Sequence, residues 1–522
     1  MTIAWHQPAD LLGGAWIEHP PDGLTSCNPA RPHEAVWRGS SSVAHVDRAV
    51  ESARGAFAEW SAWTHERRAG VLRRFGALAR EHEAALADAI RDEVGKVAWD
   101  AKAEAQLIAQ KVDITLDDSA HAGLARVRGF ELALAPGRVG RCWFRPHGVM
   151  AVVGPFNFPA HLPNGHIVPA LLMGNTVVFK PSDKAPLVGQ MLATLLHAAL
   201  CEAGAPRGVL NLVQGGADVA SRIVAHEHID GVLFTGSWPV GRRIMQANLD
   251  RPGRILALEM GGNNAVVVLD DADLARAASE IVRSAFISAG QRCTCARRVI
   301  VQRGAADRLI PAICRGASRL IIGDPGASHP VFIGPLISRE SRDHVLRQVA
   351  DLTRAGGSLL VEPRPVESDA GGFFLSPGVM RVERFERDGA TAPDGKIRSP
   401  GSDVEVFGPF LRVCVVQTED EAIEQANATD FGLAASIFTR RPDAAARFRE
   451  RVRAGCVNWN TGTAGASSKL PFGGLGLSGN HRPAGAFALD YCAYPVAGLD
   501  DDAPLAPPPG MMFDPAWLEA DA

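Results

Sequence analysis

The sequence predicts an α/β protein in which helices cover both faces of parallel β-sheets. From residue 149 onward, short continuous apolar runs alternate with helical stretches, the pattern of strands that are buried on both faces. A second set of such runs follows after residue 264. The chain of 522 residues has room for three to four domain-sized pieces of about 150 residues each. Two α/β units therefore fit the sequence better than one.

The segment 43–124, which precedes the first apolar run, has a helical pattern. Alanines and charged residues alternate there with Leu, Val and Ile at helical spacing, as in VLRRFGALAREHEAALADAIRDEVG, which ends at a glycine stop signal. Residues 127–147 change character, because a Pro136-Gly137 turn separates two possible strands. This second pattern predicts a protruding β-hairpin.

Apolar runs predict the strands of the two sheets. The first sheet is expected to contain the runs 149–153, 176–179, 209–213, 231–234 and 255–258. The second sheet is expected to contain the runs 264–269, 298–302 and 411–416. The Asp- and Pro-rich tail after Leu499 is interpreted as a surface segment rather than a domain.

Composition excludes several classes of protein. Hydrophobic residues make up 46% of the chain and charged residues 21%, which excludes a disordered or collagen-like chain. The net charge of −4 offers no electrostatic basis for binding nucleic acid or an anionic membrane. No apolar run approaches the roughly 20 residues that span a bilayer, and MTIAWHQPAD lacks the features of a secretory signal. The nine cysteines are expected to be reduced thiols of a cytoplasmic protein.

Cys293, within SAGQRCTCARR, is the first candidate for chemistry. A cysteine is a nucleophile only as the thiolate, which positive or hydrogen-bonding surroundings favour, and the nearby Gly290 and Arg292 are compatible with that need. The alternative is a small core hydrophobe, as most cysteines are. Cys295 completes a Cys-Thr-Cys pair, but a pair without a second Cys/His cluster is a poor zinc site, so no metal is expected.

Glu259 and Asn157 each follow an apolar strand. Glu259, in LALEMGGNNAVVV, stands where burial raises the pKa of a carboxyl, which is how a general base is tuned, and Gly261-Gly262 let the backbone turn or approach another group. Asn157 lies in the stiff loop GPFNFP, where a rigid amide can donate to a developing oxyanion. The simpler alternatives are a capping or salt-bridged Glu and a turn-forming Asn.

A lysine and two glycines indicate a dinucleotide site, although no G-x-G-x-x-G motif follows a strand. VLFTGSWPVG places Gly236 and Gly241 after a strand, with Ser237 where a helix would begin, and helix N-terminal N–H groups bind phosphate. Lys180, in VVFKPSDKAP, ends a strand on the rim where open α/β sheets bind ligands. Each of these signals alone is common in such folds.

Seven blocks in order identify a family. The blocks are GPFNFP, VVFKPS, FTGS, LEMGG, GQRCTC, EVFGPF at 405–410 and PFGGLGLSG at 471–479. With them the sequence resembles the NAD(P)-dependent aldehyde dehydrogenase superfamily over roughly residues 14–498. The blocks FPAHLPNGHIVPALLMGNTVVFKPS and SGNHRPAGAFALDYCAYPVA further resemble one branch, the N-succinylglutamate 5-semialdehyde dehydrogenases of bacterial arginine catabolism.

The resemblance implies a chemistry for the three candidates. Cys293 would attack the aldehyde carbon, while Asn157 and the Cys293 backbone N–H would hold the oxyanion. After hydride transfer to the nicotinamide, Glu259 would activate the water that hydrolyses the thioester. Its presence favours hydrolysis to a free acid over transfer to coenzyme A. A catalytically silent structural member is the alternative of a different class, against which the presence of all three residue types argues.

The resemblance also implies how a dinucleotide is held. The implied cofactor-binding residues are Lys180, Ser182, Asp183, Gly236, Ser237, Gly241, Glu405 and Phe407. Lys180 and Asp183 would bind the adenosine ribose, Ser237 would meet the pyrophosphate, and Glu405 would hold the nicotinamide ribose. Asp183 stands where Glu is commoner in the family, and a carboxylate repels a 2′-phosphate, so NAD is preferred over NADP.

The branch implies a substrate with two carboxylates besides the aldehyde. Arg and His donors are therefore expected at the entrance, since Arg pairs bidentately with a carboxylate. The candidates are Arg292, His161, His166, His481 and Arg482, and the alternative for each is surface solvation or a structural hydrogen bond. Another acidic or acylamino semialdehyde, such as glutamate 5-semialdehyde, is the alternative substrate.

The resemblance finally implies an aldehyde dehydrogenase fold with a Rossmann-like NAD-binding domain, an α/β catalytic domain and a β-hairpin oligomerisation arm. The NAD-binding domain would comprise 1–125, 147–261 and 452–480, the catalytic domain 262–451, the arm 126–146 and 481–498, and the tail 499–522. Exposed strand edges are unstable alone, which gives a physical reason to expect a homodimer or homotetramer.

Overall fold

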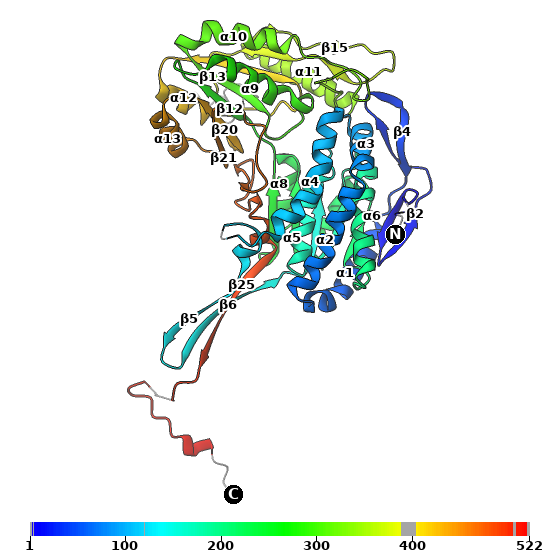
Figure 1. Ribbon diagram of the computed structural model, residues 1–522, viewed down its shortest axis with the longest axis vertical. Coiled ribbons are helices and arrows are strands. Elements are labelled where there is room, and N and C mark those ends of the chain that lie inside the picture. The colour runs from blue at the N-terminus through cyan, green and yellow to red at the C-terminus, as the bar shows by residue number, and fades with distance from the viewer. Residues whose placement is uncertain (1–2, 4, 120, 388–402, 505–507, 519–522) are drawn as a thin grey trace.

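Two sheet-containing units and a projecting arm make up the chain (Figure 1). The computed structural model describes all residues except 1–2, 4, 120, 388–402, 505–507 and 519–522. The second sheet with its helices lies at the top of Figure 1, the first sheet with its helices lies below it, and the arm extends from the base. This arrangement confirms the predicted α/β architecture of two sheet-containing units with a hairpin arm.

The first sheet has seven strands in the order β11-β10-β7-β8-β9-β1-β2. Its parallel strands are β7 (Val149–Val153), β8 (Thr176–Lys180), β9 (Leu210–Leu212), β10 (Gly231–Thr235) and β11 (Ile255–Glu259). The antiparallel edge consists of β1 (Ala9–Leu12) and β2 (Ala15–Glu18). The five predicted runs thus form strands of one sheet, because each is apolar on both faces and buries both.

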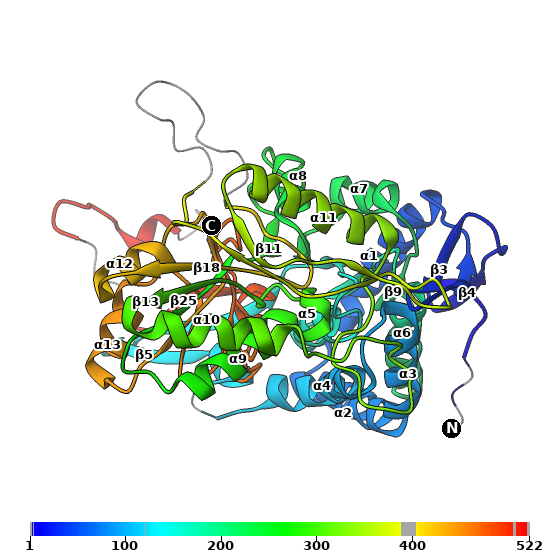
Figure 2. The same cartoon turned by 90° about the horizontal axis from the view of Figure 1, so that it is seen from above.

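Helices cover both faces of this sheet. One face packs against α2 (His65–Glu81), α3 (Glu83–Val94), α4 (Ala98–Leu116), α5 (His161–Leu172) and α6 (Pro186–Glu202). The other packs against α1 (Ala44–Ala62), α7 (Ala217–Ala225) and α8 (Trp238–Gln246). Alternate residues of β7 divide between the two cores, Met150 and Val152 on one side and Ala151 on the other. Seen from above, α2, α3 and α4 lie opposite α7 and α8 (Figure 2).

The second sheet has the order β14-β17-β18-β13-β12-β20-β21. Its strands are β12 (Asn264–Val268), β13 (Ala296–Gln302), β14 (Ser358–Val361), β17 (Gly378–Arg381), β18 (Phe410–Val416), β20 (Ala434–Phe438) and β21 (Cys456–Trp459). One face packs against α9 (Leu274–Phe286), α10 (Arg303–Ala317) and α11 (Arg339–Arg354), and the other against α12 (Glu419–Ala426) and α13 (Pro442–Arg451). Because β21 pairs with β20, residues 456–459 join this sheet, although the predicted division put 452–480 with the first unit.

Short strand pairs connect these layers. They are β3 (Leu24–Asn28) with β4 (Arg31–Gly39), β15 (Pro365–Val366) with β16 (Phe374–Leu375), β19 (Phe431–Gly432) with β23 (Leu475–Gly476), and β22 (Pro471–Phe472) with β24 (Ala484–Gly485). The segment that contains β23 reaches the first unit as well, because Gly479 bridges to Glu259 at the end of β11. This contact brings the C-terminal segment next to the candidate base.

The arm is a three-stranded antiparallel sheet of β5 (Phe130–Ala135), β6 (Arg138–Pro146) and β25 (Ala493–Asp501). The predicted hairpin is thus present, and its turn lies at Pro136-Gly137, between β5 and β6. All six residues of β5 are exposed, so one edge of this sheet is open.

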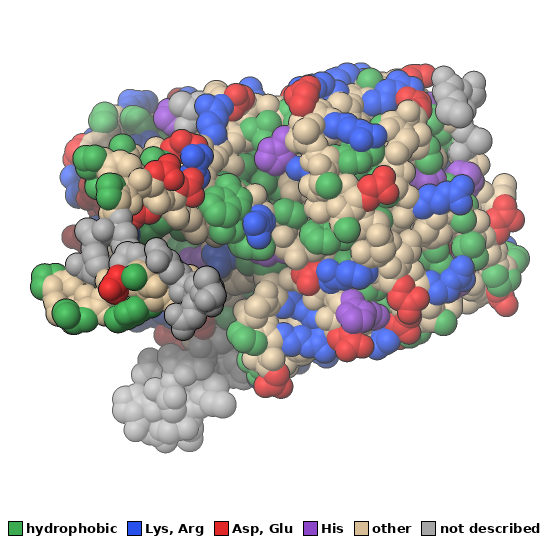
Figure 3. Space-filling view, turned by 90° about the horizontal axis from the view of Figure 1, so that it is seen from below, with side chains coloured by type: hydrophobic (Ala, Val, Ile, Leu, Met, Phe, Trp, Pro, Cys, Tyr) green, Lys and Arg blue, Asp and Glu red, His purple; other side chains and the backbone are tan. Residues whose placement is uncertain are grey.

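Charges of both signs alternate over the main body seen from below (Figure 3), which agrees with the small net charge. Among the described residues, no helix combines the length and the apolar character needed to cross a membrane. All nine cysteines are free thiols.

Candidate active site

A cavity of about 980 Å³ lies at the carboxyl ends of the strands of the first sheet and reaches the second unit. Its lining includes nine of the predicted residues: Asn157, Lys180, Ser182, Asp183, Gly236, Ser237, Cys293, Glu405 and Phe407. The cavity thus connects the candidate nucleophile with the candidate dinucleotide residues. Glu259 and Gly241 lie directly behind this lining, since each adjoins Met260 in the chain or in space.

The loop that carries Cys293 is tied to β12. Asn264, the first residue of β12, donates its amide Nδ2 to the carbonyl oxygens of Cys293 at 2.7 Å and Cys295 at 2.8 Å. The Asn264 amide oxygen accepts from the Ala434 backbone N–H at 2.9 Å. A Cβ on Gly262 would lie 2.6 Å from the Cys293 carbonyl oxygen, so the glycine permits this close approach.

Asn157 follows β7 and reaches the same loop. Its amide Nδ2 donates to the Gln291 carbonyl oxygen at 2.9 Å, two residues before Cys293, and the side chain is buried. The Gln291 amide in turn accepts from the Ile337 N–H and donates to the carbonyls of Ser288 and Pro335. This hydrogen bond ties the Asn157 amide to the loop two residues before the thiol, and both side chains line the same cavity.

Glu259 is the last residue of β11 and is 5% exposed. Its Oε2 has no hydrogen-bond partner among the described residues, and a Cβ on Gly473 would lie 2.9 Å from its Oε1. Burial raises the pKa of Glu259 well above its ordinary value, and the hydrogen bond from the Ala484 backbone only partly offsets this effect. A desolvated carboxyl with one free oxygen and a raised pKa has the properties that a general base needs.

The pKa of the Cys293 thiol is also shifted. Burial raises its pKa, and the neighbouring carboxyl groups of Glu405 and Glu259 raise it further. Burial likewise raises the pKa of Glu405, against the opposing charge of Arg297 and a hydrogen bond from the Gly262 N–H. Without a ligand, burial therefore shifts all three groups toward their protonated forms.

The cofactor half of the cavity begins at Lys180, which ends β8 and is 4% exposed. Its ammonium donates to the Pro181 carbonyl at 2.5 Å. Burial lowers the pKa of Lys180 to about 8, against the charges of Asp183 and Asp218, which raise it. Ser182 hydrogen-bonds Asp183 at 3.4 Å, beside this ammonium. A cation flanked by carboxylates suits a ribose diol better than a ribose phosphate.

The N-terminus of α8 forms the middle of the cavity. Ser237 is its N-cap, and no described side chain caps the first N–H groups of this helix. A Cβ on Gly236 would lie 2.4 Å from Phe234, and one on Gly241 would lie 2.3 Å from the Met260 sulfur. The two glycines therefore let α8 approach the sheet closely, so that its N-terminus opens toward an anion.

Glu405 and Phe407 close the far side of the cavity. A Cβ on Gly261 would lie 1.9 Å from a Glu405 oxygen, which explains why glycine follows Met260. The Phe407 ring packs edge-on against Phe156 with centroids 6.1 Å apart. From the second unit, the Phe407 ring thus meets the loop of Asn157, and the Glu405 carboxylate meets the Gly261-Gly262 backbone.

The five predicted substrate residues do not line this cavity. Both ring nitrogens of His166 are engaged, by Tyr491 at 2.8 Å and Thr235 at 3.2 Å, which leaves none for a substrate carboxylate. Arg292 binds Asp100 and Ser288. These two residues thus make structural hydrogen bonds, which was the alternative stated for each candidate.

The other three substrate candidates have free groups. His161 has a buried Nδ1 without a partner among the described residues. Burial lowers the pKa of His161 to about 3, and Lys111, Lys96 and Arg292 act in the same direction. His481 and Arg482 are exposed, directly after Asn480, whose amide binds both Leu258 N–H and Leu256 carbonyl on β11.

Sequence reasoning missed the supports of the site. Asn264 is the last residue of the segment LEMGGNN and the first residue of the buried strand β12. A polar residue at the start of a buried strand is the signal in the sequence that could have indicated its supporting role. Asp100 and Glu104 lie inside a segment whose charges suggest only an exposed helix face, but both are buried. No local pattern indicates which loops these carboxylates contact.

The chain is similar to known proteins over most of its length. The aldehyde dehydrogenase family model matches residues 16–495. An N-succinylglutamate 5-semialdehyde dehydrogenase of Sphingopyxis alaskensis is 46% identical over 92% of this chain and 94% of its own length. One of Chromobacterium violaceum is 42% identical over 95% of this chain and 97% of its own length.

Solved structures agree with the sequence match. Lactaldehyde dehydrogenase from Escherichia coli superposes with a TM-score of 0.84 at 28% identity, covering 94% of this chain and 99% of that one. A Thermus 1-pyrroline-5-carboxylate dehydrogenase with bound NAD gives 0.84 at 29% identity, over 94% and 92%. With a matching family model, close relatives and the same fold around a cysteine-containing cavity, this chain belongs to the aldehyde dehydrogenase family.

Proposed function

We propose that this enzyme oxidises N-succinyl-L-glutamate 5-semialdehyde to N-succinyl-L-glutamate with NAD as the acceptor. The observation that carries the proposal is one cavity that contains both Cys293 beside Asn157 and the residues suited to a dinucleotide. The names of relatives at 42–46% identity over nearly the full chain support the substrate.

The cavity fits a dinucleotide in volume and in polarity. Lys180 and Asp183 offer a cation and a carboxylate to a ribose, α8 offers its N-terminus to a pyrophosphate, and Glu405 offers a carboxylate to the second ribose. Bound NAD supplies the acceptor for the hydride that leaves the substrate carbon. The carboxylate of Asp183 disfavours a 2′-phosphate, so we propose NAD rather than NADP.

The proposed reaction starts with the Cys293 sulfur. Its proton leaves to solvent water, and the resulting thiolate sulfur bonds to the aldehyde carbon. The carbonyl oxygen becomes an oxyanion that accepts from the Asn157 amide and the Cys293 backbone N–H. This negative charge drives out the hydride from the same carbon, and a thioester on Cys293 remains.

Hydrolysis then releases the acid. Glu259 takes a proton from a water molecule, whose oxygen bonds to the thioester carbon, and the carbon–sulfur bond breaks to return the Cys293 thiolate. The unpaired Oε2 of Glu259 is available for that proton. The net change is oxidation of the aldehyde to the carboxylate, with one water consumed, one hydride removed and two protons released.

The substrate carries two carboxylates at the end opposite the aldehyde. Because His161, His481 and Arg482 do not line the cavity of Cys293, we propose that this end of the substrate extends outside that cavity. There His161 would be a neutral hydrogen-bonding group, and His481 and the charged Arg482 would contact the carboxylates. Arg482→Ala is then expected to raise the KM for the dicarboxylic aldehyde at least tenfold and to leave the KM for propionaldehyde unchanged. Equal effects on both aldehydes would remove Arg482 from the substrate site.

Purified enzyme tests the proposal through NADH formation. N-succinylglutamate 5-semialdehyde is expected to give a higher kcat/KM than glutamate 5-semialdehyde or propionaldehyde, and NAD a higher rate than NADP. A plain aliphatic aldehyde that matches or exceeds the succinylated one would contradict the substrate. Cys293→Ala should abolish oxidation with NAD binding retained, whereas Cys201→Ala, at an exposed thiol, should leave both intact.

A further inference from the structure

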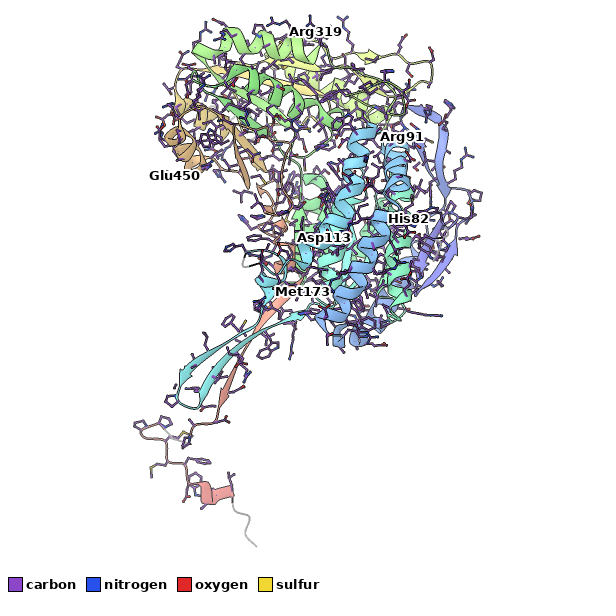
Figure 4. The ribbon with its side chains drawn as sticks, viewed as in Figure 1. His82, Arg91, Asp113, Met173, Arg319 and Glu450 are labelled. Atoms are coloured by element: carbon purple, nitrogen blue, oxygen red, sulfur yellow. The ribbon has the colours of Figure 1, made fainter. Side chains whose placement is uncertain are left out.

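Two carboxylates on one face of α4 are buried next to the candidate active site. Asp100 is 2% and Glu104 1% exposed, and they stand one helical turn apart. Helix α4 starts at the second unit, where the Trp99 indole donates to the Val331 carbonyl at 3.1 Å, and runs toward the arm, with Asp113 in its lower half (Figure 4). Each carboxylate contacts a different catalytic loop.

Asp100 contacts the loop that leads to Cys293. One of its oxygens accepts from the Ser288 hydroxyl and the other from the Arg292 guanidinium, both at 2.5 Å. The Arg292 Nε also donates to the Ser288 hydroxyl at 2.8 Å, so the three side chains close a ring of hydrogen bonds. Arg292, one of the three members of this ring, is the residue directly before Cys293.

The backbone inside that ring has an unfavourable conformation. Ser288 and Ala289 have φ values of 53° and 54°, and Gly290 follows with 71°. L side chains rarely adopt this left-handed region, and two in succession need support from surrounding contacts. Asp100 supplies that support from a different unit of the protein. Loss of the Asp100 hydrogen bonds would let this loop relax toward a more favourable backbone conformation, and the Cys293 sulfur would move with it.

Glu104 contacts the loop that carries Asn157. Its Oε1 accepts from the backbone N–H groups of Ala160 at 3.0 Å and His161 at 3.1 Å, where α5 begins. Its Oε2 accepts from the Lys96 ammonium at 2.5 Å. Asn157 stands three residues before Ala160, so Glu104 fixes the short segment that aims the amide.

Charges in this cluster balance in pairs. Lys96 faces Glu104 and lies 3.3 Å above the Phe158 ring, and the Arg292 guanidinium lies 5.0 Å from the same ring. Burial acts to raise the pKa of Asp100, but Lys96, Arg292 and the Ser288 hydrogen bond outweigh it, and its pKa lies below the ordinary value. The carboxylate is therefore ionised over the working pH range and binds its loop as an anion.

We infer that Asp100 and Glu104 are positioning residues for the oxidation. Asp100, through Ser288 and Arg292, sets the place of the Cys293 sulfur, and Glu104 sets the place of the Asn157 amide. A single rigid helix thereby fixes nucleophile and oxyanion donor relative to each other. This inference rests on the proposed roles of Cys293 and Asn157, and it assigns Arg292 to the thiol loop rather than to a substrate carboxylate.

The first experiment compares Asp100→Asn with Asp113→Asn, a control on the exposed side of the same helix whose partner is Arg80. Asp100→Asn is expected to lower kcat at least tenfold for the succinylated aldehyde and for propionaldehyde alike, with little change in KM. It should also slow alkylation of Cys293 by iodoacetamide without substrate. A rise in KM confined to the dicarboxylic aldehyde would overturn the inference and return Arg292 to the substrate site.

A second variant covers the case in which Asp100→Asn does not fold. Ser288→Ala keeps the Asp100–Arg292 ion pair and removes only the hydroxyl that both share. It should slow Cys293 alkylation to a smaller extent than Asp100→Asn, with unchanged affinity for NAD. Unchanged alkylation together with unchanged kcat would overturn the role of this ring.

A double-mutant cycle tests Glu104. Glu104→Gln places an amide against Lys96 and is expected to lower kcat at least tenfold in the otherwise intact enzyme. In an Asn157→Ala background the same change should cost at most twofold, because the amide that Glu104 aims is already gone. Additive losses would overturn the coupling. If Asn157→Ala alone leaves kcat unchanged, the proposed function fails instead.

Discussion

Three acidic groups share the resting site, and burial raises the pKa of each of them. Glu405 and Glu259 both lie close enough to Cys293 for their negative charge to disfavour ionisation of its thiol. Raised pKa values favour the protonated forms of the nucleophile and the base, and each must lose its proton to work. The reactivity of the thiol therefore depends on how its two carboxyl neighbours are charged.

Glu405→Gln tests this coupling at the thiol. Glu405 is the carboxyl group that raises the pKa of Cys293 most, so its removal lowers that pKa and more thiolate is present at a given pH. Alkylation of Cys293 by iodoacetamide without cofactor is expected to shift toward lower pH. The KM for NAD should rise in the same variant. An alkylation profile that stays in place or moves to higher pH would show that Glu405 does not act on this sulfur.

Glu259→Gln separates the two halves of the reaction. A general base contributes about 100- to 10,000-fold, so steady-state turnover should fall by about that factor while the first burst of NADH persists. In the unchanged enzyme, the raised pKa means that the base form appears only above the ordinary range of Glu, so the hydrolytic rate should rise with pH there. Stopped-flow measurement of burst and steady state checks both.

The matched control is Glu450→Gln, an exposed residue of α13 that does not line the cavity (Figure 4). Its burst, its steady-state rate and its pH profile should equal those of the unchanged enzyme. Equal slowing of burst and steady state in Glu259→Gln would assign Glu259 to an earlier step.

Elements with continuous apolar runs were the predictable part of the fold. The run 149–153 coincides with β7, and 231–234 lies within β10, because such strands are apolar on both faces and fit no surface element. The strand β20, Ala434–Phe438, was not predicted, since a short alanine-containing run does not distinguish a strand from a helix by periodicity. The N-terminal strands β1–β4 likewise have no strong pattern.

Helix α8 is an element whose position depends on one glycine. Gly241→Ala brings a Cβ to 2.3 Å from the Met260 sulfur, so the helix must move or Met260 must shift. Overpacking of this kind costs about 1–3 kcal/mol of folding free energy. The N-terminus of α8 moves with it, and the KM for NAD is expected to rise severalfold. Thermal unfolding and initial rates measure the two effects.

The control for this variant is Gly70→Ala on α2, where a new Cβ meets no atom within 4 Å. Alanine in an exposed helical position should stabilise the protein by about 0.5–1 kcal/mol without an effect on NAD. A Gly241→Ala enzyme with unchanged stability and KM would mean that Met260 adapts without cost.

The whole molecule joins segments that no local pattern connects. Asp100 lies 188 residues before Ser288, and Asn264 lies 29 residues before Cys293. The sequence blocks could indicate Cys293, Asn157 and the dinucleotide residues, since their types and spacing are distinctive, and the structure gathers them around one cavity. Partners such as Asp100 depend on tertiary packing, which periodicity does not report.

The arm gives the molecule an open apolar edge, and we propose that a second copy of the chain covers it. Phe130, Leu132 and Leu134 alternate along β5, so they share one face, and each is more than half exposed. An unpaired edge strand with an apolar face favours association. The proposed state is a homodimer or homotetramer, which sedimentation equilibrium measures directly.

Leu132→Lys with Leu134→Lys should dissociate this assembly. Burying a leucine contributes about 1.5–3 kcal/mol, and each 1.4 kcal/mol is a factor of ten, so the Kd for association is expected to rise by about 100-fold or more. Ala133→Lys adds the same charge on the opposite face of β5 and should leave the mass unchanged. Two outcomes would show that this face of the arm is not the contact between copies. One is a monomer for the unsubstituted protein, and the other is a double variant with the same assembly mass as the unsubstituted protein. Because the cavity is formed within one chain, the dissociated variant should still bind NAD.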